Sequence, residues 1–276
     1  MKRLIQDLLR RSGLYHRVKA SRAYEVYWSF ADKRLVDARK MEIAFYRTLL
    51  SELPQGGLIF DVGANQGHKT SVFLELGSRV IAVDPDPHNQ EILKQSFRRL
   101  RLVHKPVTII GKAVSDTIGE AIFWVDEPGS AKNTLSEKWV DALREDKDRF
   151  GAPLGFQNKR TVATTTLDAL IAEHGQPHFI KIDVEGHEPG VIRGLTQPVP
   201  CLSFEVNLPD FLAEGIDCIR LLKGIRSDGE FNFVADSRCD EGLVLEKWCD
   251  CETLEAILNT CKEPSIEIFW RNPVNA

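Results

Sequence analysis

The sequence predicts an α/β fold in which a mostly parallel sheet is covered by helices on both faces. From about residue 55 onward, short apolar runs alternate with segments of helical periodicity, which is typical of such a sheet. A glycine-bearing turn follows the first apolar run, and an acidic residue ends the second. The 276 residues suffice for one sizeable domain, and the hydrophobic content of 43% supports a packed core.

Residues 1–50 predict an N-terminal helical extension. Apolar positions recur at helical spacing in residues 4–9 and again in residues 41–50. The stretch Pro54–Gly57 then interrupts the helical pattern. We therefore place a domain boundary near residue 50 and assign residues 51–276 to the α/β domain.

The first part of this domain reads as alternating strands and helices. The strand candidates are residues 58–62, 79–84, 107–110, 121–125, 160–164, 179–183 and 202–206. The helix candidates between them are residues 68–76, 87–100 and 167–173. Right-handed crossovers would bring the carboxyl ends of the parallel strands to one edge, where ligands bind in folds of this kind.

The tail of the chain has a different pattern. Residues 231–234 and 243–245 predict a hairpin, residues 253–258 a short helix, and residues 266–270 a closing strand. All six cysteines lie in the last third of the chain, and a chain of this length does not need disulfides. Four of these cysteines lack the spacing of paired zinc knuckles, so we interpret them as free thiols and predict no metal site.

Charge is distributed unevenly along the chain. The net charge is −4, yet residues 1–50 hold twelve lysines and arginines against five acidic residues. The acidic remainder argues against nucleic-acid binding, which requires a basic face, whereas the basic extension suits peripheral contact with an anionic membrane surface. The beginning of the chain lacks a secretory pattern, and no apolar run approaches the roughly 20 residues of a membrane span, so we expect a cytoplasmic protein.

The strongest motif is the turn after the first strand, Asp61-Val62-Gly63-Ala64-Asn65-Gln66-Gly67. Glycines let the backbone turn sharply, and the helix that follows begins with free N–H groups. Asp84 ends the next strand, where a carboxylate can accept the hydroxyls of a ribose. The candidate cofactor-binding residues here are Asp61, Gly63, Asn65, Gly67 and Asp84.

The spacing within this turn favours S-adenosylmethionine over a dinucleotide. A dinucleotide fingerprint is G-x-G-x-x-G, but Asn65 stands at the second glycine position and His68 at the third. S-adenosylmethionine has no pyrophosphate, and the carboxylate of Asp61 suits its cationic sulfonium and ammonium groups. Asp116 is expected near the adenine, with its neighbours Ser115 and Ala113 as alternatives.

Two segments resemble the signature segments of the FkbM-type methyltransferases. They are Phe60-Asp61-Val62-Gly63-Ala64-Asn65-Gln66-Gly67 and Ile180-Lys181-Ile182-Asp183-Val184-Glu185-Gly186-His187-Glu188, with Thr165-Thr166-Leu167-Asp168 resembling the approach to the second. The resemblance covers roughly residues 55–210. It implies a Rossmann-like class I methyltransferase fold, S-adenosylmethionine as the donor, and methylation of a hydroxyl on a sugar, glycan or secondary metabolite.

The second segment carries the candidate catalytic residues Asp183, Glu185 and His187. Methyl transfer to a hydroxyl requires a positioned oxygen and the removal of its proton. His187 has a pKa suited to a base near neutral pH, while the two carboxylates can act as bases when desolvated or can orient the histidine. A divalent cation held by these three residues is the less favoured alternative, because a metal site needs further ligands.

Three further residues are candidate substrate contacts. Asn133 and Thr134 lie in the polar loop 129–135, which is expected to close over the cofactor or the substrate. Glu205 lies near the end of the next predicted strand, residues 202–206. The expected partner is a small-molecule or glycan acceptor. An NAD-linked oxidoreductase and a non-catalytic scaffold with the same fold are the alternative functions.

Overall fold

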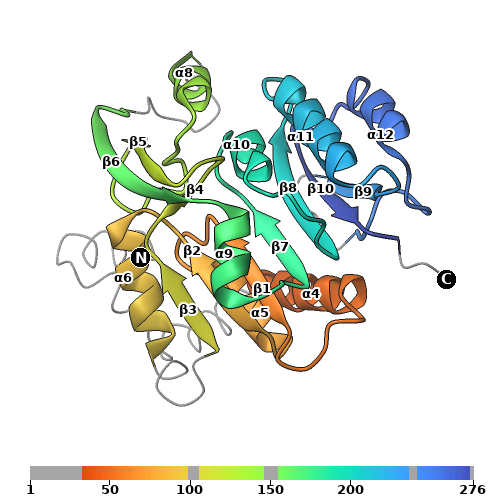
Figure 1. Ribbon diagram of the computed structural model, residues 1–276, viewed down its shortest axis with the longest axis horizontal. Helices are drawn as coiled ribbons and strands as arrows, with labels where there is room; N and C mark the ends of the chain where they lie inside the picture. The colour runs from red at the N-terminus through yellow and green to blue at the C-terminus, as the bar shows by residue number, and fades with distance from the viewer. Residues whose placement is uncertain (1–32, 99–105, 146–154, 236–240, 274–276) are drawn as a thin grey trace.

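A seven-stranded sheet forms the centre of the molecule (Figure 1). The computed structural model describes residues 33–98, 106–145, 155–235 and 241–273. The sheet has the order β3-β2-β1-β7-β8-β10-β9, and every pairing is parallel except those of β10, which lies antiparallel between β8 and β9. Its strands are β1 (Leu58–Val62), β2 (Arg79–Val83), β3 (Val107–Ile110), β7 (Phe179–Ile182), β8 (Cys201–Asn207), β9 (Glu230–Ala235) and β10 (Ser265–Arg271). The predicted α/β class with a mostly parallel sheet is confirmed.

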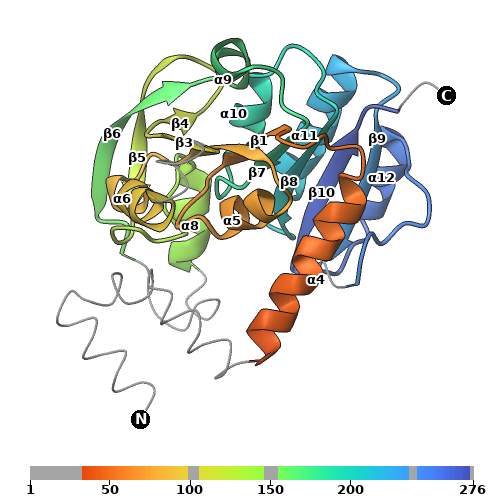
Figure 2. The ribbon, with the colours of Figure 1, turned by 90° about the horizontal axis from the view of Figure 1, so that it is seen from below.

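Helices cover both faces of this sheet (Figure 2). α4 and α5 lie on one face, and α9, α10 and α11 lie on the other. The helices are α4 (Lys33–Leu49), α5 (His68–Glu75), α6 (Pro87–Ser96), α8 (Glu137–Glu145), α9 (Leu167–His174), α10 (Glu188–Arg193), α11 (Leu212–Ile225) and α12 (Cys251–Leu258). The strands of the sheet centre are buried on both faces, which explains why they read as continuous apolar runs in the sequence.

A second, three-stranded sheet adjoins the main sheet. It has the order β4-β6-β5, with strands β4 (Ala113–Val114), β5 (Gly119–Val125) and β6 (Asn158–Thr165). β5 and β6 pair antiparallel, and they contain the two strands that the sequence predicts at residues 121–125 and 160–164. The segment between β5 and α8 returns from this sheet toward the main one.

The register of the central strands places three strand ends together. Asp61 pairs with Lys181 across β1 and β7, and Val62 pairs with Val83 across β1 and β2. Each of these strands ends within one or two residues of these pairs. Because the three strands are parallel, the residues that follow them meet at one edge of the sheet.

α4 is the described part of the predicted N-terminal extension. Tyr46 in α4 is 0% exposed and packs edge-on against Phe73 of α5, with Phe179 of β7 also in contact. The remainder of the extension, residues 1–32, lies outside the described residues. The division of the chain near residue 50 stays a prediction.

The tail differs from the expected arrangement. Residues 231–234 belong to β9 as predicted, but residues 243–245 form no strand, so the predicted hairpin is wrong. β9 pairs instead with the closing strand β10, which is distant in sequence. The segment 243–245 only runs beside β9, through the bonds from the Val244 N–H to Phe233 O and from the Leu245 N–H to Asn232 Oδ1.

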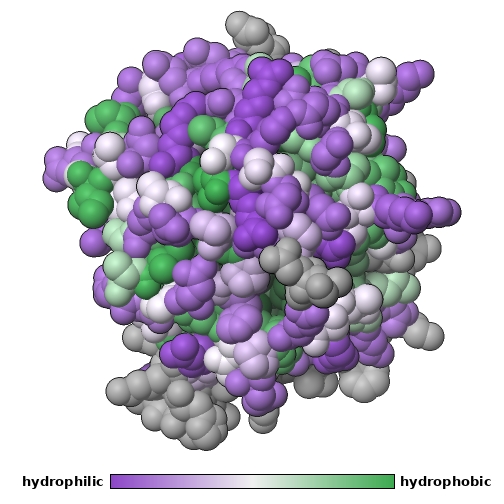
Figure 3. Space-filling model, turned by 45° about the vertical axis from the view of Figure 1, so that its right-hand side comes forward, coloured by the Kyte–Doolittle hydropathy of each residue, from purple (hydrophilic) through white to green (hydrophobic). Residues whose placement is uncertain are grey.

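The surface is mainly polar on the face shown in Figure 3, where apolar side chains are interspersed among hydrophilic ones. Within the described ranges, no helix is long and apolar enough to cross a membrane. Residues 4–9, on which the expected membrane contact depends, lie outside those ranges, so that contact stays a prediction.

Candidate active site

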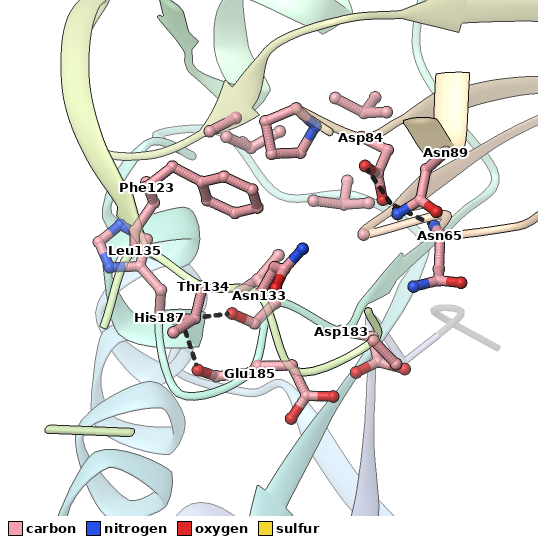
Figure 4. Close-up of a pocket in the computed structure, with 18 of the residues that line it drawn as sticks. Asn65, Asp84, Asn89, Phe123, Asn133, Thr134, Leu135, Asp183, Glu185 and His187 are labelled. Carbon is pink, nitrogen blue, oxygen red and sulfur yellow. Dashed lines mark hydrogen bonds between the residues drawn. The ribbon is translucent and has the colours of Figure 1, made fainter. Parts of the chain in front are cut away.

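A cleft of about 640 Å³ opens at the shared edge of β1, β2 and β7 (Figure 4). The main residues in its wall come from the ends of these strands, from β4 and β5, and from the segment between β5 and α8. Eight of the predicted site residues line it: Gly63, Asn65, Asp84, Asn133, Thr134, Asp183, Glu185 and His187. The remaining four, Asp61, Gly67, Asp116 and Glu205, lie outside the lining.

Gly63, directly after β1, lies against the backbone of Asp183, directly after β7. Its φ is +81°, and a Cβ at this position would lie 1.8 Å from the carbonyl oxygen of Asp183. Glycine is therefore required by the contact between two chain segments. Gly67, with φ +87°, precedes α5 and packs against Leu93 and Phe97 away from the cleft.

Asp84 lies in a shell of hydrogen-bond donors at the end of β2. Its Oδ2 accepts the N–H of Asn65 at 2.8 Å, while its Oδ1 accepts the N–H of Asp86 at 2.9 Å and Nδ2 of Asn89 at 3.2 Å. Burial raises the pKa of Asp84 to about 6, although these three donors oppose the rise. A carboxylate offers about four acceptor positions, so Oδ2 retains room for one more donor.

Asp61 lies beneath the cleft. It is 2% exposed and accepts a hydrogen bond from Thr70 Oγ1 at 2.5 Å. Burial raises the pKa of Asp61 to about 6, while Thr70 and Lys181 act in the opposite direction. Asp61 does not line the cleft, so the contact with a cationic cofactor that the sequence suggests stays a prediction.

Lys181 is a buried cation at the centre of the sheet. Its Nζ lies 3.4 Å from Oδ2 of Asp183 and 3.8 Å from Oε1 of Glu267 on β10. Burial alone would lower the pKa of Lys181, but these two carboxylates outweigh it and raise the pKa. Glu267 also accepts hydrogen bonds from Tyr46 at 3.2 Å and from Ser203 at 2.7 Å, so the network spans α4, β7, β8 and β10.

The segment after β7 carries a group of carboxylates with few donors. Burial raises the pKa of Glu185 well above its ordinary value, and Asp183, Glu205 and Glu188 raise it further. Burial likewise raises the pKa of Glu188 to about 7 and that of Glu205 to about 8. In Figure 4 the carboxylates of Glu185 and Asp183 point toward one another inside the cleft.

Glu185 also has an unusual backbone conformation. Its φ is +56°, in a region that favours glycine, and such residues are often found at functional sites. Thr134 Oγ1 donates to the carbonyl oxygen of Glu185 at 2.7 Å and holds this conformation in place. No sequence pattern indicates this conformation, because it depends on a hydrogen bond from a segment about 50 residues away.

His187 faces a different wall of the cleft. Its Nε2 lies 3.0 Å from Ser115 Oγ, which in turn donates to Oδ1 of Asp116 at 3.2 Å. Burial lowers the pKa of His187, although Asp116 opposes this, so the imidazole is neutral near pH 7. In Figure 4 its ring points away from the carboxylates of Asp183 and Glu185.

Asn133 and Thr134 line the cleft, but their polar atoms already bind protein groups. Asn133 Nδ2 donates to Oδ2 of Asp86 at 2.9 Å and to the carbonyl oxygen of Glu127 at 3.0 Å, while its Oδ1 accepts the N–H of Asp126 at 2.9 Å. The side chain of Asn133 therefore holds the segment in shape. The substrate contact expected of Asn133 and Thr134 stays a prediction.

Glu205 lines a smaller, separate pocket of about 230 Å³ together with Glu188 and Phe211. Gly186 belongs to this pocket while Glu185 belongs to the main cleft, so the two spaces lie on either side of one turn. Among the residues that the structure describes, no group of three or more histidines, cysteines, aspartates or glutamates has the geometry of a metal site.

Sequence reasoning missed several residues of the cleft. Asn89, Lys112 and Phe123 line it, and the ring of Phe123 projects into it in Figure 4. Asn89 Oδ1 is buried with no hydrogen-bond partner among the described residues. Lys181 carried a usable signal, since a lysine within an apolar strand next to Asp183 indicates a buried ion pair. Asn89 and Phe123 carried none.

The fold and the cleft define a Rossmann-like α/β protein with a ligand site at the carboxyl ends of parallel strands. Residues 61–222 match the methyltransferase FkbM domain, and the chain belongs to this family of methyltransferases. Both resembling segments of the sequence fall within or overlap the matched range, which confirms the resemblance.

Three further comparisons place the chain among more distant proteins. It is 25% identical over 164 residues to the hexuronic acid methyltransferase AglP of Haloferax volcanii, covering 58% of this chain and 59% of that protein. A precorrin-6y C5,15-methyltransferase from Geobacter metallireducens aligns with a TM-score of 0.40 at 12% identity, over 85% of this chain and 88% of that one. An O-methyltransferase from Bacillus cereus aligns with a TM-score of 0.40 at 12% identity, over 86% and 81%.

Proposed function

We propose that the protein is an S-adenosylmethionine-dependent methyltransferase that methylates a hydroxyl group of a sugar. The observation that carries this proposal is that Asp84 and the segment from Asp183 to His187 line one cleft. One side of the cleft suits an adenosyl group, and the other suits the removal of a proton. Membership of the FkbM family supports methyl transfer as the reaction.

The residues present fit an adenosyl cofactor. A ribose carries two hydroxyl donors, and the β2 end has an acceptor position left on Asp84 Oδ2 and an unpartnered oxygen on Asn89. Phe123 and Val114 supply apolar surface suited to a planar base. The neighbouring carboxylates of Asp183 and Glu185 suit a cationic sulfonium.

In this proposal, S-adenosylmethionine would supply an electrophilic methyl group, with a neutral thioether as the leaving group. The carboxylate of Asp183 accepts a hydrogen bond from the acceptor hydroxyl and orients its oxygen. Glu185 takes the hydroxyl proton as the oxygen–methyl bond forms, since its raised pKa makes it a stronger base than an ordinary carboxylate. His187, held by Ser115, shapes the opposite wall and binds the acceptor.

The proposed acceptor is a sugar, with a hexuronic acid as the first candidate. This choice rests on the named relative, of which the aligned region spans 59%. Lys112 in the lining supports an anionic sugar, because its ammonium group can pair with a carboxylate. The metal-independent reaction is preferred to one that uses a divalent cation, because carboxylates with raised pKa values can take the proton themselves.

Calorimetric titration with S-adenosylmethionine tests the first half of this proposal. We expect one binding site per chain, and the absence of binding at millimolar cofactor would refute the proposal. Incubation with methyl-labelled cofactor and a panel of uronic acids, neutral sugars and amines, with and without a chelator, tests the second half. Label that appears only on amines would refute hydroxyl methylation, and activity abolished by the chelator would refute the metal-independent reaction.

A further inference from the structure

We propose that Asp86 is a positioning residue that fixes the 126–135 loop across the cofactor cleft, so that this wall is formed before any ligand binds. The 126–135 loop is the segment that joins β5 to the residues before α8. The identity of the ligand rests on the proposed function, whereas the fixing of the loop does not.

The carboxylate of Asp86 is 0% exposed and is shared between two parts of the fold. Its Oδ1 accepts the N–H of His88 at 2.9 Å, which caps the beginning of α6. Its Oδ2 accepts the N–H of Gly129 at 2.8 Å and Nδ2 of Asn133 at 2.9 Å. One carboxylate oxygen therefore belongs to the helix, and the other belongs to the loop.

The backbone of Asp86 connects this arrangement to the cleft. Its N–H donates to Oδ1 of Asp84 at 2.9 Å, so the residue that holds the loop also orients the proposed ribose acceptor. Gly129, at the tip of the 126–135 loop, has a φ of +78°. A Cβ at this position would lie only 2.5 Å from Cδ2 of His88. The tip of the loop is thus packed against the start of α6.

The base of the loop is fixed on the opposite side of the cleft. Trp124 and Thr134 form a two-bond antiparallel bridge, with N···O distances of 2.8 and 3.1 Å. Thr134 Oγ1 accepts the N–H of Ser136 at 2.8 Å and donates to the carbonyl oxygen of Glu185 at 2.7 Å. The loop therefore links the β2 side of the cleft to the β7 side.

The fixed segment contributes a large share of the cleft wall. The lining residues from the loop are Ser130, Ala131, Asn133, Thr134 and Leu135. A wall that is already ordered spares the ligand the entropic cost of ordering it, and this benefit appears mainly as a slower dissociation rate. Loss of the Asp86 contacts should therefore free the loop and speed the release of the ligand.

Hydrogen–deuterium exchange of the free protein, measured on peptides that cover residues 126–135, tests the first step. In Asp86→Asn an amide NH₂ group faces the N–H donors of the loop, and we expect exchange there to rise roughly tenfold or more, as for the loss of buried hydrogen bonds. Asn133→Ala, which leaves the cap of α6 intact, should have a similar effect. The double variant should raise exchange by less than the product of the two single effects, because the two residues share one contact.

The matched control is Asp250→Asn. Asp250 caps α12 through the N–H of Thr253 at 2.8 Å, so this variant removes an equivalent helix cap in another part of the fold. It should leave exchange in residues 126–135 unchanged. A rise equal to that of Asp86→Asn would overturn the proposal, since the effect would then follow from general loosening of the fold.

The dissociation rate of S-adenosylmethionine tests the second step. We expect it to rise roughly tenfold in Asp86→Asn and Asn133→Ala, with little change in the association rate. Unchanged exchange in both folded variants would overturn the proposal, as would faster exchange with an unchanged dissociation rate. If Asp86→Asn fails to fold, Asn133→Ala decides alone. If the unmodified protein binds no cofactor, the proposed function fails, while the exchange data still decide whether Asp86 holds the loop.

Discussion

The two sides of the cleft differ in how many hydrogen-bond donors reach their carboxylates. At the end of β2, Asp84 accepts three hydrogen bonds from neighbouring N–H groups. After β7, no hydrogen bond from a described residue reaches the carboxylate of Glu185, which faces Asp183 instead. Asp84 is buried and Glu185 is half-buried, and both carboxyl groups have raised pKa values, but only Asp84 is stabilised by donors.

This difference suits the β2 side to binding the cofactor and the β7 side to the removal of a proton. A carboxylate that is held by donors is rigid and suits the recognition of a ligand, whereas one that lacks donors has a greater affinity for a proton. The β7 side can keep several carboxylates together because Lys181 lies behind them, 3.4 Å from Asp183. The following variants test this division.

The largest effect is expected from Glu185→Gln. If Glu185 takes the proton, methyl transfer to the sugar acceptor should slow by roughly 10²- to 10⁴-fold, whereas the affinity for S-adenosylmethionine should fall much less, because Asp183 remains beside the sulfonium. Steady-state kinetics and calorimetry measure the two quantities separately. Glu120→Gln, an exposed glutamate on β5, is the control. A rate within a factor of a few of the unmodified protein would show that the β7 side is not the reacting side.

Lys181→Met should strongly lower the free energy of unfolding. It leaves Asp183 and Glu267 without their buried cation, and breaking a buried ion pair costs about 3–5 kcal/mol. Lys138→Met removes the exposed ion pair with Glu214 and should cost about 1 kcal/mol or less. Urea unfolding of both variants gives the comparison. Similar losses in the two variants would mean that Lys181 does not hold the carboxylates together.

Asp84→Asn should weaken binding of S-adenosylmethionine by roughly 10- to 100-fold, the usual range for a lost charged hydrogen bond. The amide presents donors to groups that already donate, such as the N–H of Asn65. Calorimetry measures the affinity, and Asp228→Asn, an exposed partner of Arg226, is the control. Equal affinity in the two variants would remove the β2 side from cofactor binding.

The smallest effect concerns the pH dependence of stability. Burial raises the pKa of Glu205 from 4.5 to about 8, so folding favours its protonated form. This contribution is complete below pH 4.5 and is lost as the pH rises toward 8. Glu205→Gln cannot ionise, so its stability relative to the unmodified protein should improve steadily as the pH rises from 5 to 8. A stability difference that is independent of pH would contradict the raised pKa.

The sequence predicts the strands of the central sheet more accurately than it predicts the pairing of the strands in the tail. The strands of the sheet centre were recognised because burial on both faces requires continuous apolar runs. The composition of segment 243–245 predicts a strand, but the segment contacts β9 only through the bond from the Val244 N–H to Phe233 O and through the side chain of Asn232, on the edge opposite β10. Composition shows that a segment is apolar and does not show which partner it will find.

The sequence predicts the site residues at the strand ends, but not those whose role depends on a distant segment. Asp84 and Asp183 were found because a parallel sheet brings strand ends together whatever the side chains do. Asp86 and Asn89 were missed, since their roles depend on where the 126–135 loop returns. Asp61 lies near the end of β1 as predicted, but its carboxylate accepts a hydrogen bond from Thr70 and does not line the cleft.

By itself, the sequence determined the order of strands and helices, the glycine turn and the positions of the acidic residues at the strand ends. These features are local, because they follow from periodicity and from residues a few positions apart. Only the tertiary structure decided which carboxylates receive donors, which face one another, and which one holds the 126–135 loop. Those properties depend on desolvation and on atoms from distant segments, and neither is encoded at any single position in the chain.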